Sequence, residues 1–86
     1  MNEKKRLSDL MPQEWATVKR LDTPQEMRRR FLDIGLIEGT RVLCVGKSPA
    51  NDPSAYLIRG AVIAIRRRDA QTVAIELPRT ERNAWD

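Results

Sequence analysis

The sequence has no histidine and only one cysteine, Cys44, among its 86 residues. It therefore lacks imidazole, the side chain that most often serves as a general base and as a transition-metal ligand. A single cysteine cannot form an internal disulfide or a cysteine-rich zinc site, and no histidine is present to activate it as a nucleophile. These absences argue against an enzyme, and we predict a protein that uses no cofactor and acts by binding.

Glycine-rich loops and long apolar runs are also missing. The glycines are scattered, and none of them opens a phosphate-binding loop before a helix. The first residues are charged and no apolar segment follows them, so the sequence shows no secretory signal. No stretch approaches the roughly 20 apolar residues that a membrane-spanning helix needs. We expect a cytoplasmic protein.

Aromatic residues are few, because phenylalanine and tyrosine occur once each and tryptophan twice. The apolar share of 41% still favours a globular chain, and its length allows one domain over residues 1–86. We expect an ordered part at about 7–77 and a frayed tail at 78–86. The expected core is aliphatic apart from one ring: Val18, Met27, Phe31, Leu32, Val42, Ile58, Ile63, Ile65, Val73 and Ile75.

The net charge is +4, with 16 basic and 12 acidic residues, which favours an acidic partner. Two arginine triplets, at 28–30 and 66–68, form either a solvated rim or a surface for such a partner. A nucleic-acid-binding barrel is the weaker alternative, because single strands also need exposed aromatics and only Tyr56 and Trp15 are available.

Apolar periodicity predicts a strand at Trp15–Leu21 and a helix at about 24–34, where Met27, Phe31 and Ile34 share one face. Thr23 is the expected N-cap of this helix, in a capping box with Glu26, and Gly35 ends the helix. Residues 1–14 read as a loose leader with a short helical turn capped at Ser8-Asp9, in which Leu7 and Leu10 reach the core. The other expected elements are strands at 41–45, 54–59, 61–66 and 71–77, a loop at 46–53 and a 3₁₀ turn at 67–70.

Five short strands cannot form two packed sheets, but they can curl into a small, partly open barrel. We therefore predict a mainly β fold, a small five-stranded barrel with one inserted α-helix. Gly35, Gly39 and Gly60 are expected at the structural turns.

The residues present offer two candidate sites, one for a reactive thiol and one for a metal ion. Cys44 lies mid-strand and reads as a small buried hydrophobe, with a reactive thiol as the alternative. Asp33, Glu38 and Asp52 could form a hard-metal site, but they lie on different predicted elements and have no characteristic spacing. We expect no metal site.

The stretch from Met27 to Val42, Met-Arg-Arg-Arg-Phe-Leu-Asp-Ile-Gly-Leu-Ile-Glu-Gly-Thr-Arg-Val, resembles the signature of the FeoA family. Further matches are Leu7-Ser8-Asp9-Leu10 with Pro12, Tyr56-x-Ile58-Arg59-Gly60, Ala64-Ile65-Arg66-Arg67 and Val73-x-Ile75. The family often has glycine after the opening proline, where this chain has Gln13.

The resemblance implies an SH3-like barrel and a cytosolic accessory protein of ferrous iron transport. Its partner would be FeoB, the ferrous iron permease with a GTP-binding cytoplasmic part, which it would bind and modulate. A related barrel ends repressors of the DtxR type, so an SH3-like regulatory module is the alternative, although no helix-turn-helix precedes the barrel. Direct metal binding and a homo-oligomer are further alternatives.

The resemblance carries over no catalytic residues. From the sequence we expect the partner to contact a surface around Arg28, Arg29, Tyr56 and Arg59, where basic donors would join an aromatic ring at the barrel rim.

Overall fold

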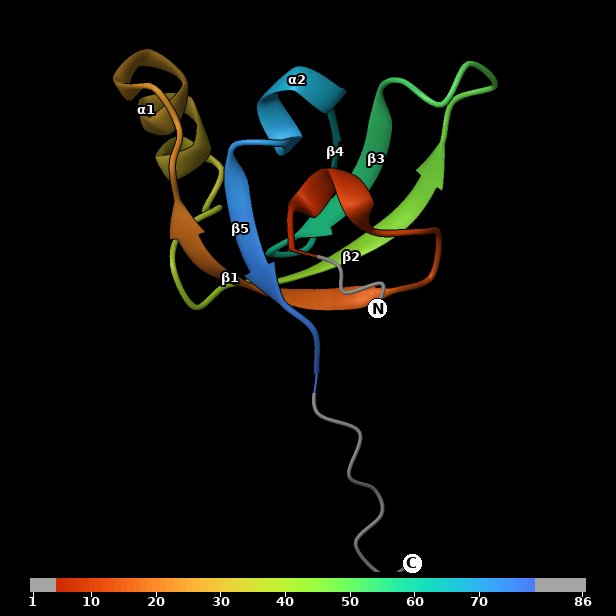
Figure 1. The fold of residues 1–86 in the computed structure, drawn as a ribbon, viewed down its shortest axis with the longest axis horizontal. Helices are drawn as coiled ribbons and strands as arrows, with labels where there is room; N and C mark the ends of the chain where they lie inside the picture. The colour runs from red at the N-terminus through yellow and green to blue at the C-terminus, as the bar shows by residue number, and fades with distance from the viewer. Residues whose placement is uncertain (1–4, 79–86) are drawn as a thin grey trace, which may run out of the picture.

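The computed structural model describes residues 5–78, which form one antiparallel sheet with a helix inserted between its first two strands (Figure 1). The strand order is β4-β3-β2-β1-β5. The elements, in chain order, are η1 (Leu7–Asp9), β1 (Trp15–Leu21), α1 (Gln25–Asp33), β2 (Arg41–Lys47), β3 (Ser54–Ile58), β4 (Ala61–Ile65), α2 (Arg67–Ala70) and β5 (Val73–Glu76). The predicted mainly β fold, with five strands and a helix after the first, is confirmed.

The sheet curls strongly, so that β5 and β1 fold over the inner face of the other strands (Figure 1). Two irregularities in the ladders accompany this curvature, one in β1 between Val18 and Arg20 and one in β2 between Cys44 and Gly46. Such bulges add local twist to a strand and allow a small sheet to bend.

The segment before β1 is part of the fold. The Ile75 amide donates to the carbonyl of Lys5 at 3.0 Å, and Arg6 forms an isolated bridge with Ala74. Leu7 and Leu10 are fully buried, as expected for the two leucines. From Lys5 onward, the prediction of a loose leader is therefore wrong. Residues 1–4 and all of the predicted tail except Pro78 lie outside the described part of the chain.

The inserted helix begins at Gln25 rather than at a threonine cap. Thr23 makes no capping bond. Its hydroxyl lies 2.8 Å from that of Thr72, which itself donates to the Asp69 carbonyl. The predicted capping box is wrong because this tertiary bond takes the Thr23 hydroxyl. Gly35 ends the helix as expected, with a φ of +85°.

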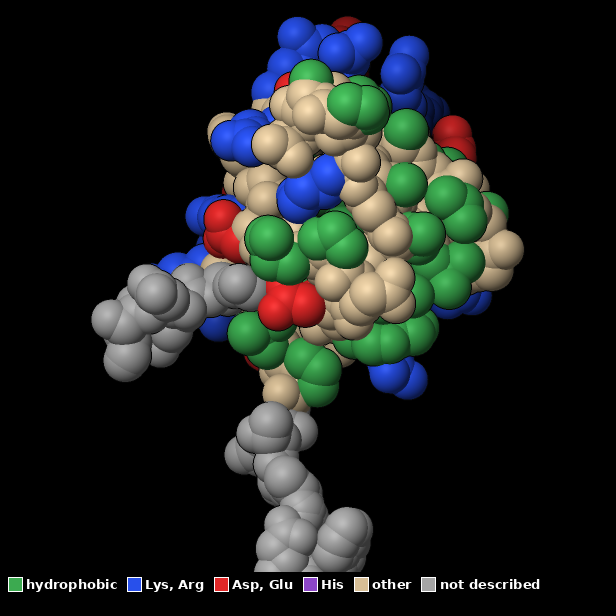
Figure 2. All heavy atoms as spheres, turned by 90° about the vertical axis from the view of Figure 1, so that its right-hand side faces the viewer, with side chains coloured by type: hydrophobic (Ala, Val, Ile, Leu, Met, Phe, Trp, Pro, Cys, Tyr) green, Lys and Arg blue, Asp and Glu red, His purple; other side chains and the backbone are tan. Residues whose placement is uncertain are grey.

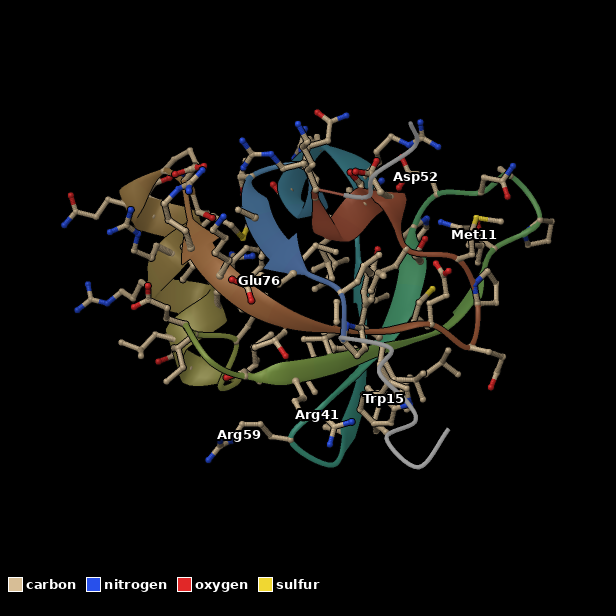
Figure 3. The ribbon with its side chains drawn as sticks, turned by 60° about the horizontal axis from the view of Figure 1, so that its bottom comes forward. Met11, Trp15, Arg41, Asp52, Arg59 and Glu76 are labelled. Carbon is tan, nitrogen blue, oxygen red and sulfur yellow. The ribbon has the colours of Figure 1, made fainter. Side chains whose placement is uncertain are left out.

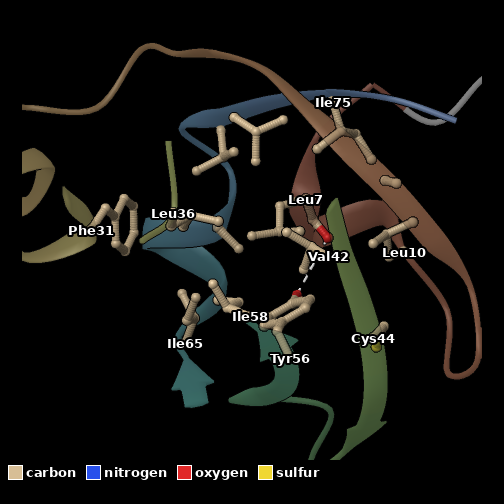
Figure 4. Close-up of a cluster of buried hydrophobic side chains, with 14 residues drawn as sticks. Leu7, Leu10, Phe31, Leu36, Val42, Cys44, Tyr56, Ile58, Ile65 and Ile75 are labelled. Atoms are coloured by element: carbon tan, nitrogen blue, oxygen red, sulfur yellow. Dashed lines mark hydrogen bonds between the residues drawn. The ribbon is translucent and has the colours of Figure 1, made fainter. Parts of the chain in front are cut away.

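The core lies between the curled strands, η1 and α1 (Figure 4). Of the expected core, Val18, Phe31, Val42, Ile58, Ile65, Val73 and Ile75 are buried, and Met27 and Ile63 pack against them. Leu32 is 60% exposed, so its assignment to the core is wrong. It follows Phe31 on α1, and a step of one residue turns a helical side chain by about 100°. Leu36, Tyr56 and Cys44 are further buried members.

The connection between β3 and β4 is a two-residue turn made by Arg59 and Gly60, with φ angles of 48° and 89°. Positive φ at both positions is typical of the type I′ turn, whose twist matches that of paired strands. The other predicted boundaries shift by a few residues. The segment Arg67–Ala70 is one α-helical turn rather than a 3₁₀ turn, because the Ala70 amide bonds to the carbonyl of Arg66, four residues earlier.

Candidate partner-binding surface

The predicted contact residues do not form one surface. Arg28 and Arg29 are exposed on α1, where they line a shallow hollow together with Leu32. Arg59 lies in the β3–β4 turn, and Tyr56 lies in the core. The expected combination of Arg28, Arg29 and Arg59 around an exposed Tyr56 is therefore absent.

Tyr56 is 1% exposed, so it cannot be a rim aromatic. Its side chain points inward from β3 with those of Ser54 and Ile58, while Ala55 and Leu57 point outward. The Tyr56 hydroxyl donates to the Leu7 carbonyl at 3.3 Å (Figure 4). Burial raises the pKa of Tyr56 to about 12. The ring thus belongs to the structural core.

Among residues 5–78 the exposed aromatic is Trp15, and it begins a row of apolar side chains across the outer face of the sheet. Trp15 pairs with Leu43, Leu43 with Leu57, and Leu57 with Val62, so four strands contribute one residue each. Trp15 is 38% exposed and Val62 is 61% exposed. We call Trp15, Leu43, Leu57 and Val62 the outer apolar row. Contiguous exposed apolar groups of this kind mark contact sites on soluble domains.

Basic side chains border the outer apolar row. The Arg41 guanidinium lies 4.7 Å from the centre of the Trp15 ring, within the range of a cation–π interaction. Figure 3 shows both side chains on the same side of the sheet, with Arg59 at the nearby β3–β4 turn. Because Val42 pairs with Ile58, Arg41 and Arg59 lie at the same end of β2 and β3. This arginine–aromatic pair consists of Arg41 and Trp15, neither of which is among the predicted contact residues.

Arg59 is held in position by both its backbone and its side chain. Its left-handed backbone is uncommon for a residue other than glycine, asparagine or aspartate. Its aliphatic stem lies over Gly35, where an added Cβ would overlap Arg59 Cδ. The stem thus packs on the bare backbone that ends α1.

Exposed hydrophobic side chains are also prominent on the side of the molecule where the β2–β3 connection lies. Figure 2 shows them spread over much of this face, with Lys and Arg side chains gathered along its upper edge.

A second basic region is largely neutralised within the molecule. Arg20 binds Asp22 through Nε and Nη2 at 2.8 and 2.9 Å, and Arg6 Nη1 binds the same carboxylate at 2.8 Å. The hydrogen bonds from Arg20 and Arg6 hold the pKa of Asp22 well below its usual range. This cluster fastens the N-terminal segment to the end of β1 and does not present free arginines to a partner.

The described residues do not form the metal site or the reactive thiol that the sequence offers as alternatives. Within residues 5–78 no group of three or more His, Cys, Asp and Glu side chains could hold a metal ion, so Asp33, Glu38 and Asp52 do not converge. Asp52 instead accepts a bond from the Arg67 amide at 2.9 Å. Cys44 is fully buried, and burial raises the pKa of its thiol, which opposes reactivity.

None of the described helices is both long enough and apolar enough to span a membrane.

The model of the FeoA domain matches residues 5–77. The chain belongs to the FeoA family. Among curated proteins, it is 32% identical over 72 residues to the Fe(2+) transport protein A/Fe(2+) transporter FeoB fusion protein of Porphyromonas gingivalis. That match covers 84% of this chain but only 8% of the fusion protein.

Solved structures of FeoA proteins share the fold. The solution structure of FeoA from Chlorobium tepidum has a TM-score of 0.83 and 24% identity, with 91% of this chain and 74% of that chain covered. FeoA of Stenotrophomonas maltophilia complexed with zinc, described as an SH3 domain protein, has a TM-score of 0.73 and 24% identity, with coverage of 83% and 88%. The predicted SH3-like class is thus confirmed.

A manganese-dependent transcriptional repressor contains a similar fold, with a TM-score of 0.76 and 20% identity over 87% of this chain and 41% of that chain. At this identity the likeness concerns the fold alone. It agrees with the relation to repressor barrels that the FeoA resemblance implies.

Proposed function

We propose that this FeoA-family chain is a cytoplasmic accessory protein of ferrous iron transport that binds a FeoB-type permease and modulates it. The observation that carries the proposal is the fusion protein, in which a FeoA segment and a FeoB transporter form one polypeptide. Fusion holds two domains at a high effective concentration, which is useful when they work in contact.

The geometry supports binding as the mode of action. The outer apolar row offers an exposed surface with arginines at one border. Tryptophan and arginine, here Trp15 and Arg41, are residue types that are enriched among those that dominate binding energy at interfaces. We place the permease contact on this row together with Arg41 and Arg59. Arg28 and Arg29 stay a predicted second contact on α1.

The proposal is tested by measuring binding to the full-length permease in lipid nanodiscs. Wild-type chain should bind, and Trp15→Ala and Val62→Thr should each weaken binding several-fold. Met11→Ala is the control, since it removes an exposed apolar side chain that lies away from Trp15 and the outer apolar row (Figure 3). Melting curves of each variant would show that the fold is kept. No binding of the wild type would contradict the proposal.

A regulatory SH3-like module is the second candidate, favoured by the fold shared with the repressor. Within the described residues there is no helix-turn-helix that would place such a module on DNA. Binding to duplex DNA that falls steeply with salt would favour this candidate over the permease adaptor.

A further inference from the structure

The two edge strands of the sheet, β5 and β4, differ in whether their outer edges are covered by other residues. β5 is covered, because Ile75 bonds to Lys5 and Ala74 bridges Arg6. β4 has no strand neighbour beyond β3 in the described part of the chain. Proteins usually protect such an edge with a charge, a proline or a bulge. The β4 sequence, Ala-Val-Ile-Ala-Ile, contains none of these.

The register shows which main-chain groups of β4 are open. In a hairpin with a two-residue turn the flanking residues, here Ile58 and Ala61, form a hydrogen-bonded pair. Hydrogen-bonded pairs alternate with unbonded ones along an antiparallel ladder. The N–H and C=O groups of Val62 and Ala64 therefore point away from β3, and no described residue outside the ladder bonds to them.

A groove runs beside this open edge, between β4 and α1, with a volume of about 360 Å³. Met27, Phe31 and Ile34 line it from the helix, and Ile63 and Ile65 line it from the strand. The groove is therefore mainly apolar along its length.

The charges lining the groove are predominantly positive. Arg30, Arg66 and Arg68 lie along it, and the one acidic lining residue, Asp69, is 4.0 Å from Arg68. No described carboxylate pairs with Arg30 or Arg66. Two basic side chains next to an open strand edge favour an occupant that carries carboxylates.

We propose that β4 is a docking edge, to which an extended acidic segment of a partner adds as a further strand between β4 and α1. Main-chain bonds to Val62 and Ala64 would supply affinity, and side-chain pockets would supply specificity. Alternate side chains of the added strand would lie beside Ile63 in the groove and beside Val62, where they extend the outer apolar row. Carboxylates of the segment would meet Arg30 and Arg66.

A second copy of the chain is the poorer occupant, because pairing β4 with itself would bring two basic rims together, and like charges across a ladder destabilise it. This docking edge deepens the proposed function, because it names the part of the chain that a permease segment would contact. It rests on the proposed function only for the identity of that partner.

The peptide test uses two capped synthetic peptides on the isotope-labelled chain, one of alternating glutamate and valine and one of alternating lysine and valine. The glutamate peptide should shift the amide signals of Val62, Ala64 and the α1 residues of the groove and slow hydrogen exchange at Ala64. The lysine peptide should leave them unchanged. Equal effects of both peptides, no effect at β4, or self-association through β4 would overturn the proposal.

The main-chain test uses Ala64→Pro with Ala64→Val as its matched control. Proline removes an outward N–H, so it costs no bond to β3, and its ring obstructs the added strand. Ala64→Pro should weaken binding of the full-length permease about fivefold or more, the factor that one lost hydrogen bond allows. Ala64→Val should weaken it less. Equal binding by both variants would contradict the docking edge, provided that both keep the wild-type melting transition.

The charge test compares two exposed basic side chains. Arg30→Glu should weaken permease binding more than Lys19→Glu, because Arg30 lines the groove and Lys19, on β1, does not. The reverse order would overturn the proposed groove. If the permease binds but the β4 variants have no effect, the proposed function stands and the docking edge is wrong. If only the glutamate peptide binds, the docking edge stands and the permease is not the partner.

Discussion

The hydroxyl of Tyr56 on β3 donates a hydrogen bond to the main-chain carbonyl of Leu7, 3.3 Å away in the N-terminal turn. Both residues are almost fully buried, so the bond closes the core beneath the segment that precedes β1. Tyr56→Phe keeps the ring and leaves the Leu7 carbonyl without this donor. We expect a loss of about 1–2 kcal/mol in the free energy of unfolding, measured by urea titration. An unchanged midpoint would show that the bond contributes nothing.

The same residue gives a prediction about pH. Burial raises the pKa of Tyr56 from 10.0 to about 12, so the folded state keeps the phenolic proton more tightly than the unfolded state does. Stability should therefore be unaffected below pH 10 and should fall as the pH rises from 10 toward 12. Tyr56→Phe should lack that part of the decline. Identical alkaline profiles for the two proteins would contradict the burial of the phenol.

The contact between Arg59 and Gly35 can be isolated with a matched pair of glycines. Gly35 and Gly39 have φ angles of 85° and 90°, so alanine carries a similar backbone penalty of roughly 1–2 kcal/mol at either position. Only at position 35 would the new Cβ meet another group, the Arg59 stem. Gly35→Ala should therefore cost more in unfolding free energy than Gly39→Ala, and Arg59→Ala should remove the excess. Equal costs in the wild-type background would refute this packing.

Adjacent residues on α1 test the orientation of the helix. Phe31 is 3% exposed and Leu32 is 60% exposed. Phe31→Ala should cost about 3–5 kcal/mol of stability, because it leaves a cavity in the core. Leu32→Ala should stay within about 0.5 kcal/mol of the wild type, as exposed substitutions usually do. Similar losses in thermal or chemical denaturation would mean that the helix face is misassigned.

The turn before β1 offers a stabilising substitution. The Glu14 amide bonds to the Met11 carbonyl at 3.0 Å, and Gln13 has a φ of 75°, which together define a turn that favours glycine at position 13. Gln13→Gly relieves the left-handed strain but gives the unfolded chain more freedom. We expect a net gain of up to about 1 kcal/mol, seen as a higher melting temperature. A loss of stability would show that the strain at Gln13 is negligible.

The sequence was a good guide to elements and a poor guide to strand faces. Periodicity located β1 and α1 because one face of each is apolar, and Gly35, Gly39 and Gly60 indicated the turns that need positive φ. β3 and β4 are apolar on both faces, so the sequence could not show that Tyr56 points inward and Leu57 outward. That choice is made by strand register, a tertiary property, and it decides which aromatic is available to a partner.

Other errors have the same origin in long-range contacts. Thr23 has the sequence context of a helix cap, but Thr72, 49 positions later, takes its hydroxyl. The outer apolar row is visible only when four strands are aligned, since Trp15, Leu43, Leu57 and Val62 have no common spacing along the chain. The two arginine triplets stand out in the sequence, yet only the fold shows that Arg30 and Arg66 line one groove.

Our proposal is that the chain supports ferrous iron transport by contact with the permease. Its most direct test is the rate of ferrous iron uptake by cells that express the permease and either no accessory chain, the wild type, or Trp15→Ala verified as folded. We predict that the uptake rate changes when the wild type is supplied. For Trp15→Ala, the change in uptake rate should shrink in proportion to its loss of permease binding. A full effect from a variant that no longer binds would contradict the claim.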